Sequence, residues 1–233
     1  MLLKDYARVC VLMVDVRYEQ HATRIKQMLS QQGVLPDRIR LFVSGEGKLY
    51  PREFYQQVIT EKSVPPSWPK FLNFDGYSNF SAVQRVVREA LDSKATEILL
   101  MEDDCSLTPE FDAVLGSVQQ QLPRLPPWDC LYYGADHRWA EIVELSPNVI
   151  RCNRSFQFHC VGLRRNMMVE IAKQPPVNLM DCCVAYGFQS KYRAYAIWPS
   201  IAIQLPGWSV VCREHKSFAS DARGTNVTEI KSP

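Results

Sequence analysis

The 233-residue chain lacks the features that mark several large classes of protein. Its formal net charge is only +2 and its basic side chains are scattered, so nucleic acid is not an expected partner. No stretch approaches the roughly 18 apolar residues that a membrane span needs. Residues 1–6 contain no apolar segment of the signal-peptide type, and Arg8 interrupts the run that follows. We therefore expect a soluble, cytoplasmic protein.

Paired metal-binding cysteines are also lacking. None of the eight cysteines forms a C-x-x-C pair, so a structural zinc site is not expected. Cys10, Cys130 and Cys160 instead lie within apolar runs, where a free thiol behaves as a small hydrophobic side chain. We predict that most of the cysteines are buried thiols in a reducing compartment.

What the chain does contain is an alternation of apolar runs and amphipathic segments. Residues 8–14 and 39–43 have the pattern of buried strands, and residues 18–32 between them predict a helix. Ser81 is predicted to cap a helix that follows it, and Thr108 another. Further strands are predicted at 97–101, 128–133, 141–144, 149–152, 158–163, 194–198 and 201–204, and further helices at 52–60, up to Lys173, and at 181–190.

The opening strand, helix and strand are typical of an α/β fold. We predict a single domain over residues 1–218, with a mostly parallel central sheet flanked by helices. Residues 219–233 are polar and are predicted to form a flexible tail. The segment 45–75 has the weakest pattern.

Three consecutive acids, Glu102, Asp103 and Asp104, follow the apolar run of residues 97–101. Ligands of open α/β sheets bind beyond the carboxyl ends of the strands, and a hard divalent cation with substrate phosphates satisfies such acids. Because neighbouring strand residues point to opposite faces, Glu102 and Asp104 share one face. We predict Asp104 as the first metal ligand, with Glu102 beside it and Asp103 facing elsewhere. The alternative is a solvated acidic turn that caps the helix at Thr108.

Four segments resemble glycosyltransferase family 25, the lipopolysaccharide-biosynthesis and procollagen galactosyltransferase type, which has the Rossmann-like GT-A fold. The segments are residues 14–17 with Arg24, Ser81 with the strand ending at 102–104, the Trp-Asp strand of residues 128–134, and Asp181 after Pro175-Pro176 with the later Pro199. Ala82 stands where the family has a histidine after the serine.

The resemblance implies a metal-dependent glycosyltransferase that moves a hexose from a UDP-sugar to an acceptor hydroxyl with inversion. Asp181 would be the general base. The metal, Mn²⁺ or Mg²⁺, would be held by Asp104 and Glu102, with His215 as a further ligand. Around the donor, the resemblance places Asp15, Arg17, Arg24, Ser81, Glu102 and Asp103.

Several of these residues have a second interpretation. Arg24 could form a surface salt bridge, and Asp181 could cap the helix that it begins. Asp136 and His137, just after the Trp-Asp strand, could contact the acceptor or supply the base instead. His159 could be a core histidine or a metal ligand, and His215 could belong to a charged surface segment.

Two rival functions remain. A nucleotidyltransferase on a similar fold would want a glycine-rich loop after the first strand, and residues 15–18 (Asp-Val-Arg-Tyr) contain no glycine. A non-catalytic module that binds a sugar nucleotide would have no reason to keep three acids at the sheet edge. The sugar is left open, and so is the acceptor, which could be a glycan, a lipid, a protein or another hydroxyl compound.

Overall fold

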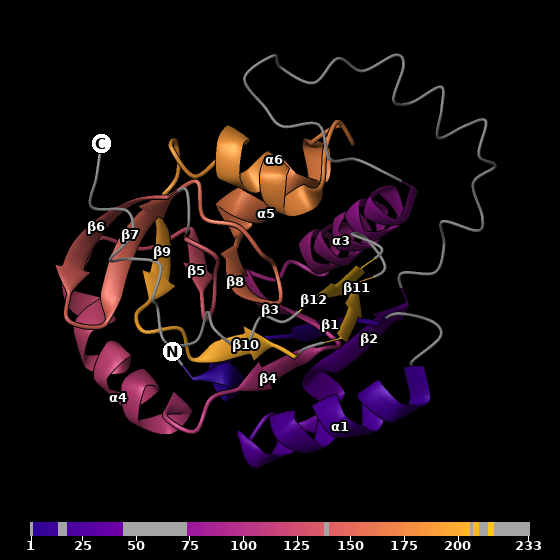
Figure 1. The fold of residues 1–233 in the computed structure, drawn as a ribbon, viewed down its shortest axis with the longest axis horizontal. Helices are drawn as coiled ribbons and strands as arrows, with labels where there is room; N and C mark the ends of the chain where they lie inside the picture. Colours follow the sequence, from indigo (N-terminus) through magenta and orange to yellow (C-terminus); the bar gives the residue numbers. More distant parts are fainter. Residues whose placement is uncertain are drawn as a thin grey trace.

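An eight-stranded mixed sheet forms the centre of the structure (Figure 1), with the strand order β2-β1-β3-β8-β5-β9-β7-β6. The computed structural model describes residues 2–13, 18–43, 74–137, 140–205, 207–209 and 214–216. The strands of the sheet are β1 (Val9–Met13), β2 (Ile39–Val43), β3 (Glu97–Glu102), β5 (Cys130–Tyr132), β6 (Glu141–Ser146), β7 (Val149–Asn153), β8 (Cys160–Arg164) and β9 (Ala194–Ile197).

Two short antiparallel pairs accompany the sheet, namely β4 (Cys105–Leu107) with β10 (Ala202–Gln204) and β11 (Gly207–Ser209) with β12 (Glu214–Lys216). The α-helices are α1 (Tyr18–Gln31), α3 (Phe74–Asp92), α4 (Phe111–Gln121), α5 (Arg165–Lys173) and α6 (Met180–Gly187). Short 3-10 helices span Leu3–Asp5, Pro36–Arg38 and Leu122–Arg124.

The direction of the strands determines which segments meet at one edge of the sheet. β1 runs parallel to both β2 and β3, and β5 runs parallel to β9, whereas the other neighbouring pairs are antiparallel. Leu12 of β1 pairs with Glu102 of β3, so the predicted acids leave the sheet beside the end of β1. β8 runs against β3, which brings its first residues to the same edge.

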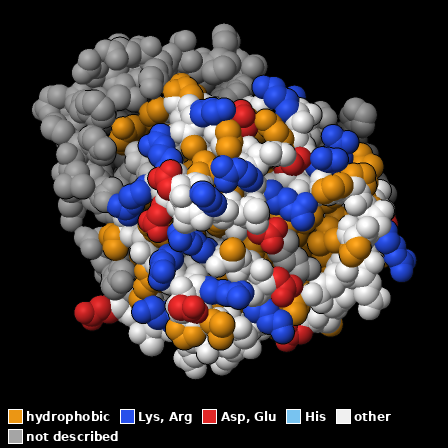
Figure 2. Space-filling view, turned by 180° about the vertical axis from the view of Figure 1, so that it is seen from behind, with side chains coloured by type: hydrophobic (Ala, Val, Ile, Leu, Met, Phe, Trp, Pro, Cys, Tyr) orange, Lys and Arg blue, Asp and Glu red, His pale blue; other side chains and the backbone are white. Residues whose placement is uncertain are grey.

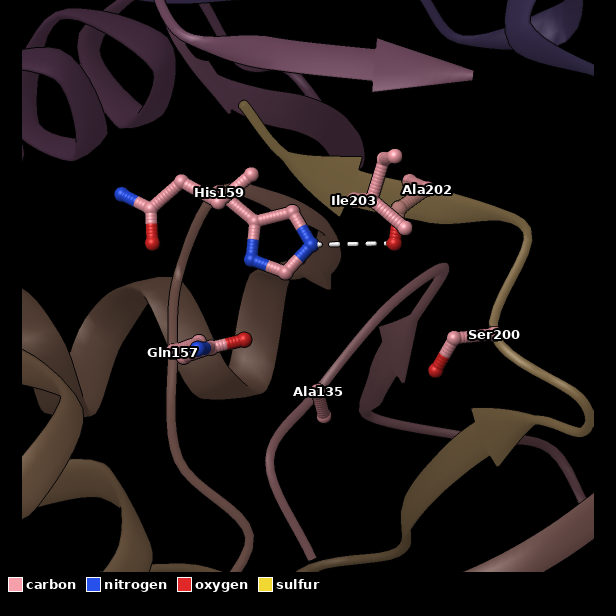
Figure 3. A pocket seen from close by; sticks show the side chains of 7 residues that line it. Ala135, Gln157, His159, Ser200, Ala202 and Ile203 are labelled. Atoms are coloured by element: carbon pink, nitrogen blue, oxygen red, sulfur yellow. Dashed lines mark hydrogen bonds between the residues drawn. The ribbon is translucent and has the colours of Figure 1, made fainter. Parts of the chain in front are cut away.

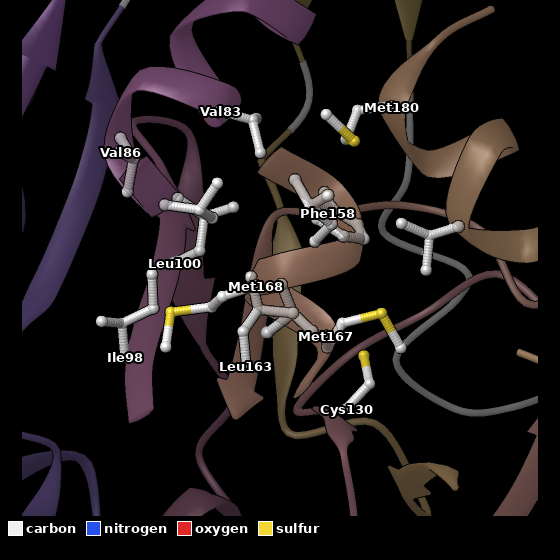
Figure 4. Packing of buried hydrophobic residues seen from close by; sticks show 14 of the residues in the cluster. Val83, Val86, Ile98, Leu100, Cys130, Phe158, Leu163, Met167, Met168 and Met180 are labelled. Carbon is white, nitrogen blue, oxygen red and sulfur yellow. The ribbon is translucent and has the colours of Figure 1, made fainter. Parts of the chain in front are cut away.

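The sheet is covered on both faces because its strands are apolar on both sides. On β3, Ile98 and Leu100 pack toward α3, α5 and α6, while Leu99 and Met101 pack toward α1 and α4. This alternation is the two-residue period of a strand. Figure 4 shows the first of the two cores, where Val83 from α3 and the methionines of α5 and α6 lie over the strands. The architecture is therefore helix, sheet and helix in three layers.

The predicted α/β fold with helices on both sides of a central sheet is confirmed. Two predicted helix starts are wrong. Ser81 does not cap a helix, because α3 begins at Phe74, where Tyr77 and Phe80 extend its buried stripe toward the amino end. α4 begins at Phe111 rather than after Thr108. The predicted helix at 52–60 lies outside the described residues.

Gly134 occupies a position where a side chain does not fit. A Cβ atom there would lie 1.9 Å from the Ala202 carbonyl oxygen and 2.7 Å from His159 Nε2. We expect Gly134→Ala to lower the free energy of unfolding by about 2 kcal/mol, because backbone must shift to relieve the overlap. Gly116→Ala in α4 is the matched control, since no atom lies within 4 Å of the added carbon. Urea denaturation of both variants tests this difference, and equal effects would contradict it.

Candidate functional site

Glu102 and Asp104 lie together at the carboxyl edge of β3. Both are partly buried, and the side-chain amide of Gln204 donates to Glu102 Oε2 at 3.2 Å and to Asp104 Oδ2 at 3.1 Å. Gln204 reaches the two acids because its strand, β10, pairs with β4, the strand that follows directly after them. In this pairing Gln204 lies opposite Cys105. The Leu205 N–H also donates to the Asp104 carbonyl oxygen. The two carboxylates are thus held on one side of the turn by a neutral donor.

Asp103 points to the opposite side, toward α1. It is 2% exposed, and its Oδ2 lies 3.2 Å from His21 Nδ1. Arg24, one helical turn further along α1, donates to the Asp103 carbonyl oxygen at 2.5 Å. Residues three apart share a helix face, so His21 and Arg24 contact the same residue. In the described residues Arg24 therefore positions the acidic turn, and its role in donor binding stays a prediction.

The carboxylates of this edge act strongly on one another. Burial, and after it the charges of Asp104 and Asp181, raise the pKa of Glu102 well above its usual value, while a hydrogen bond from Asn79 opposes the rise. Desolvation and nearby negative charge both disfavour the charged form of a carboxylate. Glu102 therefore lies in a place with an excess of negative charge, where a cation would be bound favourably.

Asp181 joins this group from a distant part of the chain. It lies in the first turn of α6, where its Oδ1 accepts from the Cys182 N–H at 2.8 Å and its Oδ2 accepts from the Gln157 N–H at 3.3 Å. Burial raises the pKa of Asp181, although these backbone donors oppose the shift. A carboxylate with a raised proton affinity is better suited to accept a proton than an ordinary surface aspartate.

The residues present fit a divalent cation shared with a ligand. Oxygen donors suit Mg²⁺ and Mn²⁺, and Mg²⁺ is commonly held by one or two carboxylates together with substrate phosphates. Within the described ranges, no three His, Cys, Asp or Glu side chains form a group that could hold a metal by themselves. Glu102 and Asp104 would supply the protein's share. The side chain of His215, the third predicted ligand, lies outside the described residues.

No family model matches the chain, and no curated protein sequence matches it. Among solved structures, the mannose-1-phosphate geranyltransferase from Thermus thermophilus overlaps with a TM-score of 0.42 and 11% identity, covering 82% of this chain and 73% of that chain. HddC from Yersinia pseudotuberculosis overlaps with a TM-score of 0.42 and 12% identity, covering 86% and 93%. These overlaps leave the family open.

A glycosyltransferase involved in the glycosylation of the major capsid of PBCV-1 overlaps with a TM-score of 0.37 and 9% identity. It covers 82% of this chain and 93% of that chain. The likeness to glycosyltransferase family 25 therefore rests on the sequence motifs alone.

The other predicted site residues divide into two groups. Asp15 and Arg17 lie outside the described residues, so their place relative to the acids stays a prediction. Ser81 lies inside α3, partly buried, two residues beyond the Asn79 that bonds Glu102. Asn79 thus connects α3 with Glu102, and the sequence does not single it out, because the predicted helix starts at Ser81, after Asn79.

The two central histidines are buried and neutral near pH 7. Burial lowers the pKa of His159 to about 4 and that of His137 also to about 4. His159 Nε2 lies 3.1 Å from the Ala202 carbonyl oxygen, and His137 Nδ1 lies 2.8 Å from Ser155 Oγ. Asp136 is only 4% exposed. Asp181 is more exposed than Asp136 and His137, and the choice between Asp181 and this pair as the base stays a prediction.

A small pocket is lined by two residues that contact these acids, because Gln204 bonds the acid pair and Gln157 bonds Asp181. It is lined by Gln157, His159, Ser200 and Gln204 together with the apolar Ala135, Ala202 and Ile203 (Figure 3). Gln157 has a positive φ of 75°, a conformation that is uncommon for residues other than glycine. Such backbone is retained where the surrounding structure requires it, and here it directs the Gln157 N–H to Asp181.

The described part of the surface seen from behind is mixed in character. Figure 2 shows basic and acidic side chains intermingled over that face. Described ion pairs include Arg8 with Glu89, Arg164 with Glu97, and Arg193 with Asp129. In the described ranges, no helix combines the length and the apolar character that crossing a bilayer requires.

His137 gives stability a pH dependence that can be measured. Its pKa of about 4 is below the 6.5 of the unfolded chain, so the unfolded state binds more protons between these values. Above pH 6.5 His137 is neutral in both the folded and the unfolded state, and the free energy of unfolding is not reduced. As the pH falls from 6.5 toward 4, protonation of His137 in the unfolded state lowers the free energy of unfolding by about 3 kcal/mol in all. Burial raises the pKa values of Glu102 and Asp181, so these two residues make the folded state less stable, relative to the unfolded state, as the pH rises. Their contribution to the pH dependence is opposite in sign to that of His137, and it is the same in the wild type and in the His137 variant.

We therefore expect His137→Asn to remove about 1 kcal/mol per pH unit from the slope of unfolding free energy between pH 6.5 and 4.5. Urea denaturation at a series of pH values measures this slope. Above pH 7.5 the difference between the two proteins should be constant, which serves as the internal control. Parallel curves down to pH 4.5 would show that the imidazole is not held neutral.

Proposed function

We propose that the chain is a metal-dependent glycosyltransferase that moves a sugar from a nucleotide-sugar, with a UDP-sugar as the first donor to test, to an acceptor hydroxyl. The observation that carries the proposal is the pair Glu102 and Asp104, which the Gln204 amide holds together at the carboxyl edge of β3, with the Asp181 carboxylate near enough for its charge to raise the pKa of Glu102. The charges of Asp104 and Asp181, from two distant segments, raise the proton affinity of Glu102, and the Gln204 side-chain amide donates to both acids of the pair. The four motif segments support the same proposal from the sequence.

The carboxylates would have different roles. Glu102 and Asp104 would hold Mn²⁺ or Mg²⁺ on the face that Gln204 lines. When bound, the ion acts as a Lewis acid that neutralises the charge developing on the leaving diphosphate. The Asp103 side chain lies 3.2 Å from His21, and Arg24 donates to the Asp103 carbonyl oxygen, so that this residue would fix the turn that carries its neighbours, while its predicted role at the donor stays a prediction.

Asp181 would accept the proton of the acceptor hydroxyl. Its backbone donors, the N–H groups of Gln157 and Cys182, fix the orientation of the carboxylate. Burial raises the pKa of Asp181 in the direction of neutral pH, which makes the carboxylate a more effective general base. The transferred sugar would be inverted at its anomeric carbon if the acceptor oxygen, losing its proton to Asp181, attacks that carbon from the side opposite the leaving diphosphate.

The test is the release of UDP from a panel of UDP-sugars by the full chain, with and without Mn²⁺. We expect hydrolysis or transfer with at least one donor in the presence of Mn²⁺ and little without it. Isothermal titration with UDP and Mn²⁺ separates the rivals. Tight nucleotide binding without turnover would favour the non-catalytic module, and diphosphate release from UTP with a sugar phosphate would favour the nucleotidyltransferase.

A further inference from the structure

One side-chain amide, that of Gln204, contacts both predicted metal ligands at once. Its Nε2 lies 3.2 Å from Glu102 Oε2 and 3.1 Å from Asp104 Oδ2. All three residues are partly exposed, so they are not sealed inside the core. Three polar side chains from two segments about a hundred residues apart in the chain therefore meet at one place.

The distances between these atoms also suit three ligands of one small cation. Mg²⁺ binds oxygen atoms in a near-ideal octahedron at about 2.1 Å, so neighbouring ligands of one ion lie about 3.0 Å apart. The Gln204 amide nitrogen lies close to this distance from each carboxylate oxygen. The same distance suits a hydrogen bond. One position of the Gln204 side chain can therefore serve both the metal-free and the metal-bound protein.

Only the oxygen of an amide binds a hard metal ion, and rotation of the amide group brings it to the acids. A half-turn about the last side-chain bond exchanges the nitrogen and oxygen atoms, and this torsion is broad and roughly twofold in glutamine. Gln204 Oε1 would then take the place of Nε2. Ionised carboxylates only accept hydrogen bonds, so the nitrogen faces them in the metal-free chain. A cation reverses that preference, because carboxylate and carbonyl oxygens both suit Mg²⁺ and Mn²⁺.

The backbone that carries Gln204 is fixed to the acidic turn on both sides of the residue. β10 pairs with β4, where Gln204 lies opposite Cys105, the residue that follows Asp104. Immediately after Gln204, the Leu205 N–H donates to the Asp104 carbonyl oxygen at 2.8 Å. A ligand on a paired strand is held more precisely than one on a loop. The amide can therefore turn without moving away from the acids.

We propose that Gln204 is a third protein ligand of the cation, bound through Oε1 after this half-turn, beside Glu102 and Asp104. The inference rests on the metal dependence of the proposed function and extends it. Within the described ranges, no three His, Cys, Asp or Glu side chains form a group that could hold the ion. The Gln204 amide oxygen supplies the further protein donor that such a group lacks.

The test counts the water molecules on Mn²⁺, because affinity alone does not separate a ligand from a supporting donor. Loss of a residue that only supports a ligand already lowers metal affinity by about 10- to 100-fold. Water enriched in oxygen-17 broadens the EPR lines of bound Mn²⁺ according to the number of waters on the ion. Gln204→Met should carry one water more than the wild type, because water replaces the amide oxygen. Gln204→Glu, which offers an oxygen at the same place, should carry the wild-type number.

Gln121→Met is the matched control for the water count. The Gln121 amide also donates to two acceptors, Ser117 Oγ at 2.8 Å and Asn148 Oδ1 at 3.1 Å, and none of these three residues belongs to the acidic turn. Its replacement removes the same number of hydrogen bonds as Gln204→Met. The number of waters on Mn²⁺ should stay at the wild-type value.

The wild type offers a second measurement that does not depend on how well a variant folds. Titration of the full chain with Mg²⁺ alone, followed by NMR, should shift the side-chain amide signals of Gln204, because its two hydrogen bonds to the acids are lost. The signals of the Gln121 amide should stay in place. Unmoved Gln204 signals at saturating Mg²⁺ would overturn the inference.

The outcomes separate this inference from the proposed function. If Gln204→Met binds Mn²⁺ with the wild-type number of waters, Gln204 is only a supporting donor and the inference is overturned, while the proposed function stands. If the water count changes as expected but no UDP-sugar is turned over, the inference is supported and the proposed function fails. If the wild type binds no Mn²⁺, with or without UDP, both fall.

Discussion

Replacing Asp104 with asparagine is expected to lower kcat/KM for sugar transfer by about 100- to 1,000-fold, the size of effect expected when a group that stabilises developing charge is removed. Asparagine keeps the shape of the side chain and can still meet the Gln204 amide with its own oxygen. It removes the negative charge that a divalent cation requires. Affinity for UDP should therefore fall with Mn²⁺ present and change little without it.

The thermal stability of Asp104→Asn should rise, although its activity falls. The charge of Asp104 contributes to the raised pKa of Glu102, which means that the two carboxylates repel each other in the folded state. Without metal, Asp104→Asn should raise the Tm, as is common when a strained functional group is removed. Asp112→Asn is the control, because Asp112 lies at an exposed position in the first turn of α4. It should change neither kcat/KM nor the Tm to a comparable extent. Full activity and metal-dependent UDP binding in Asp104→Asn would sink the enzyme proposal.

Asp181→Asn should have the second large effect, on kcat rather than on donor binding. Loss of a general base lowers rates by about 10²- to 10⁴-fold. The amide oxygen can still accept from one of the two backbone donors, the Gln157 or the Cys182 N–H, so the variant loses one hydrogen bond and its fold is checked by its thermal unfolding. The dissociation constant for UDP with Mn²⁺ should stay within about threefold, because Asp181 is not one of the predicted metal ligands and the loss of its charge only eases the ionisation of Glu102.

In Asp181→Asn, transfer of the sugar to a hydroxyl acceptor and hydrolysis of the donor should be reduced to different extents. Transfer to a hydroxyl acceptor needs the base, and rescue by a strong external nucleophile such as azide would identify the missing step as proton removal. Asp136→Asn tests the alternative base that the sequence left open. If that variant loses more activity than Asp181→Asn while remaining folded, the assignment of the base moves to Asp136.

The sequence predicted those parts of the fold that depend on short-range patterns. The bounds of β2 and the end of α5 at Lys173 agree with the structure, since a buried run and an amphipathic stripe mark them directly. The start of α3 was misplaced because Gly76 and Asn79 are poor helix formers. Packing of Tyr77 and Phe80 outweighs that preference, which only the tertiary structure reveals.

The candidate site was predicted less completely than the fold, for a similar reason. Alternation along a strand was enough to place Glu102 and Asp104 together and Asp103 apart. Gln204 was missed because its contact depends on the pairing of β10 with β4, about a hundred residues earlier in the chain. His21 could have been found from its three-residue spacing to Arg24 on one helix face.

The neutral contact of Gln204 with Glu102 and Asp104 has a consequence for how a ligand is captured. The two carboxylates already face the same side before any cation arrives, so little rotamer freedom remains to be lost on binding. An amide also leaves their charge in place, where a lysine or arginine would have cancelled it. The chain thus holds the acids in a preorganised arrangement, so that an arriving cation meets two carboxylates whose positions are already fixed.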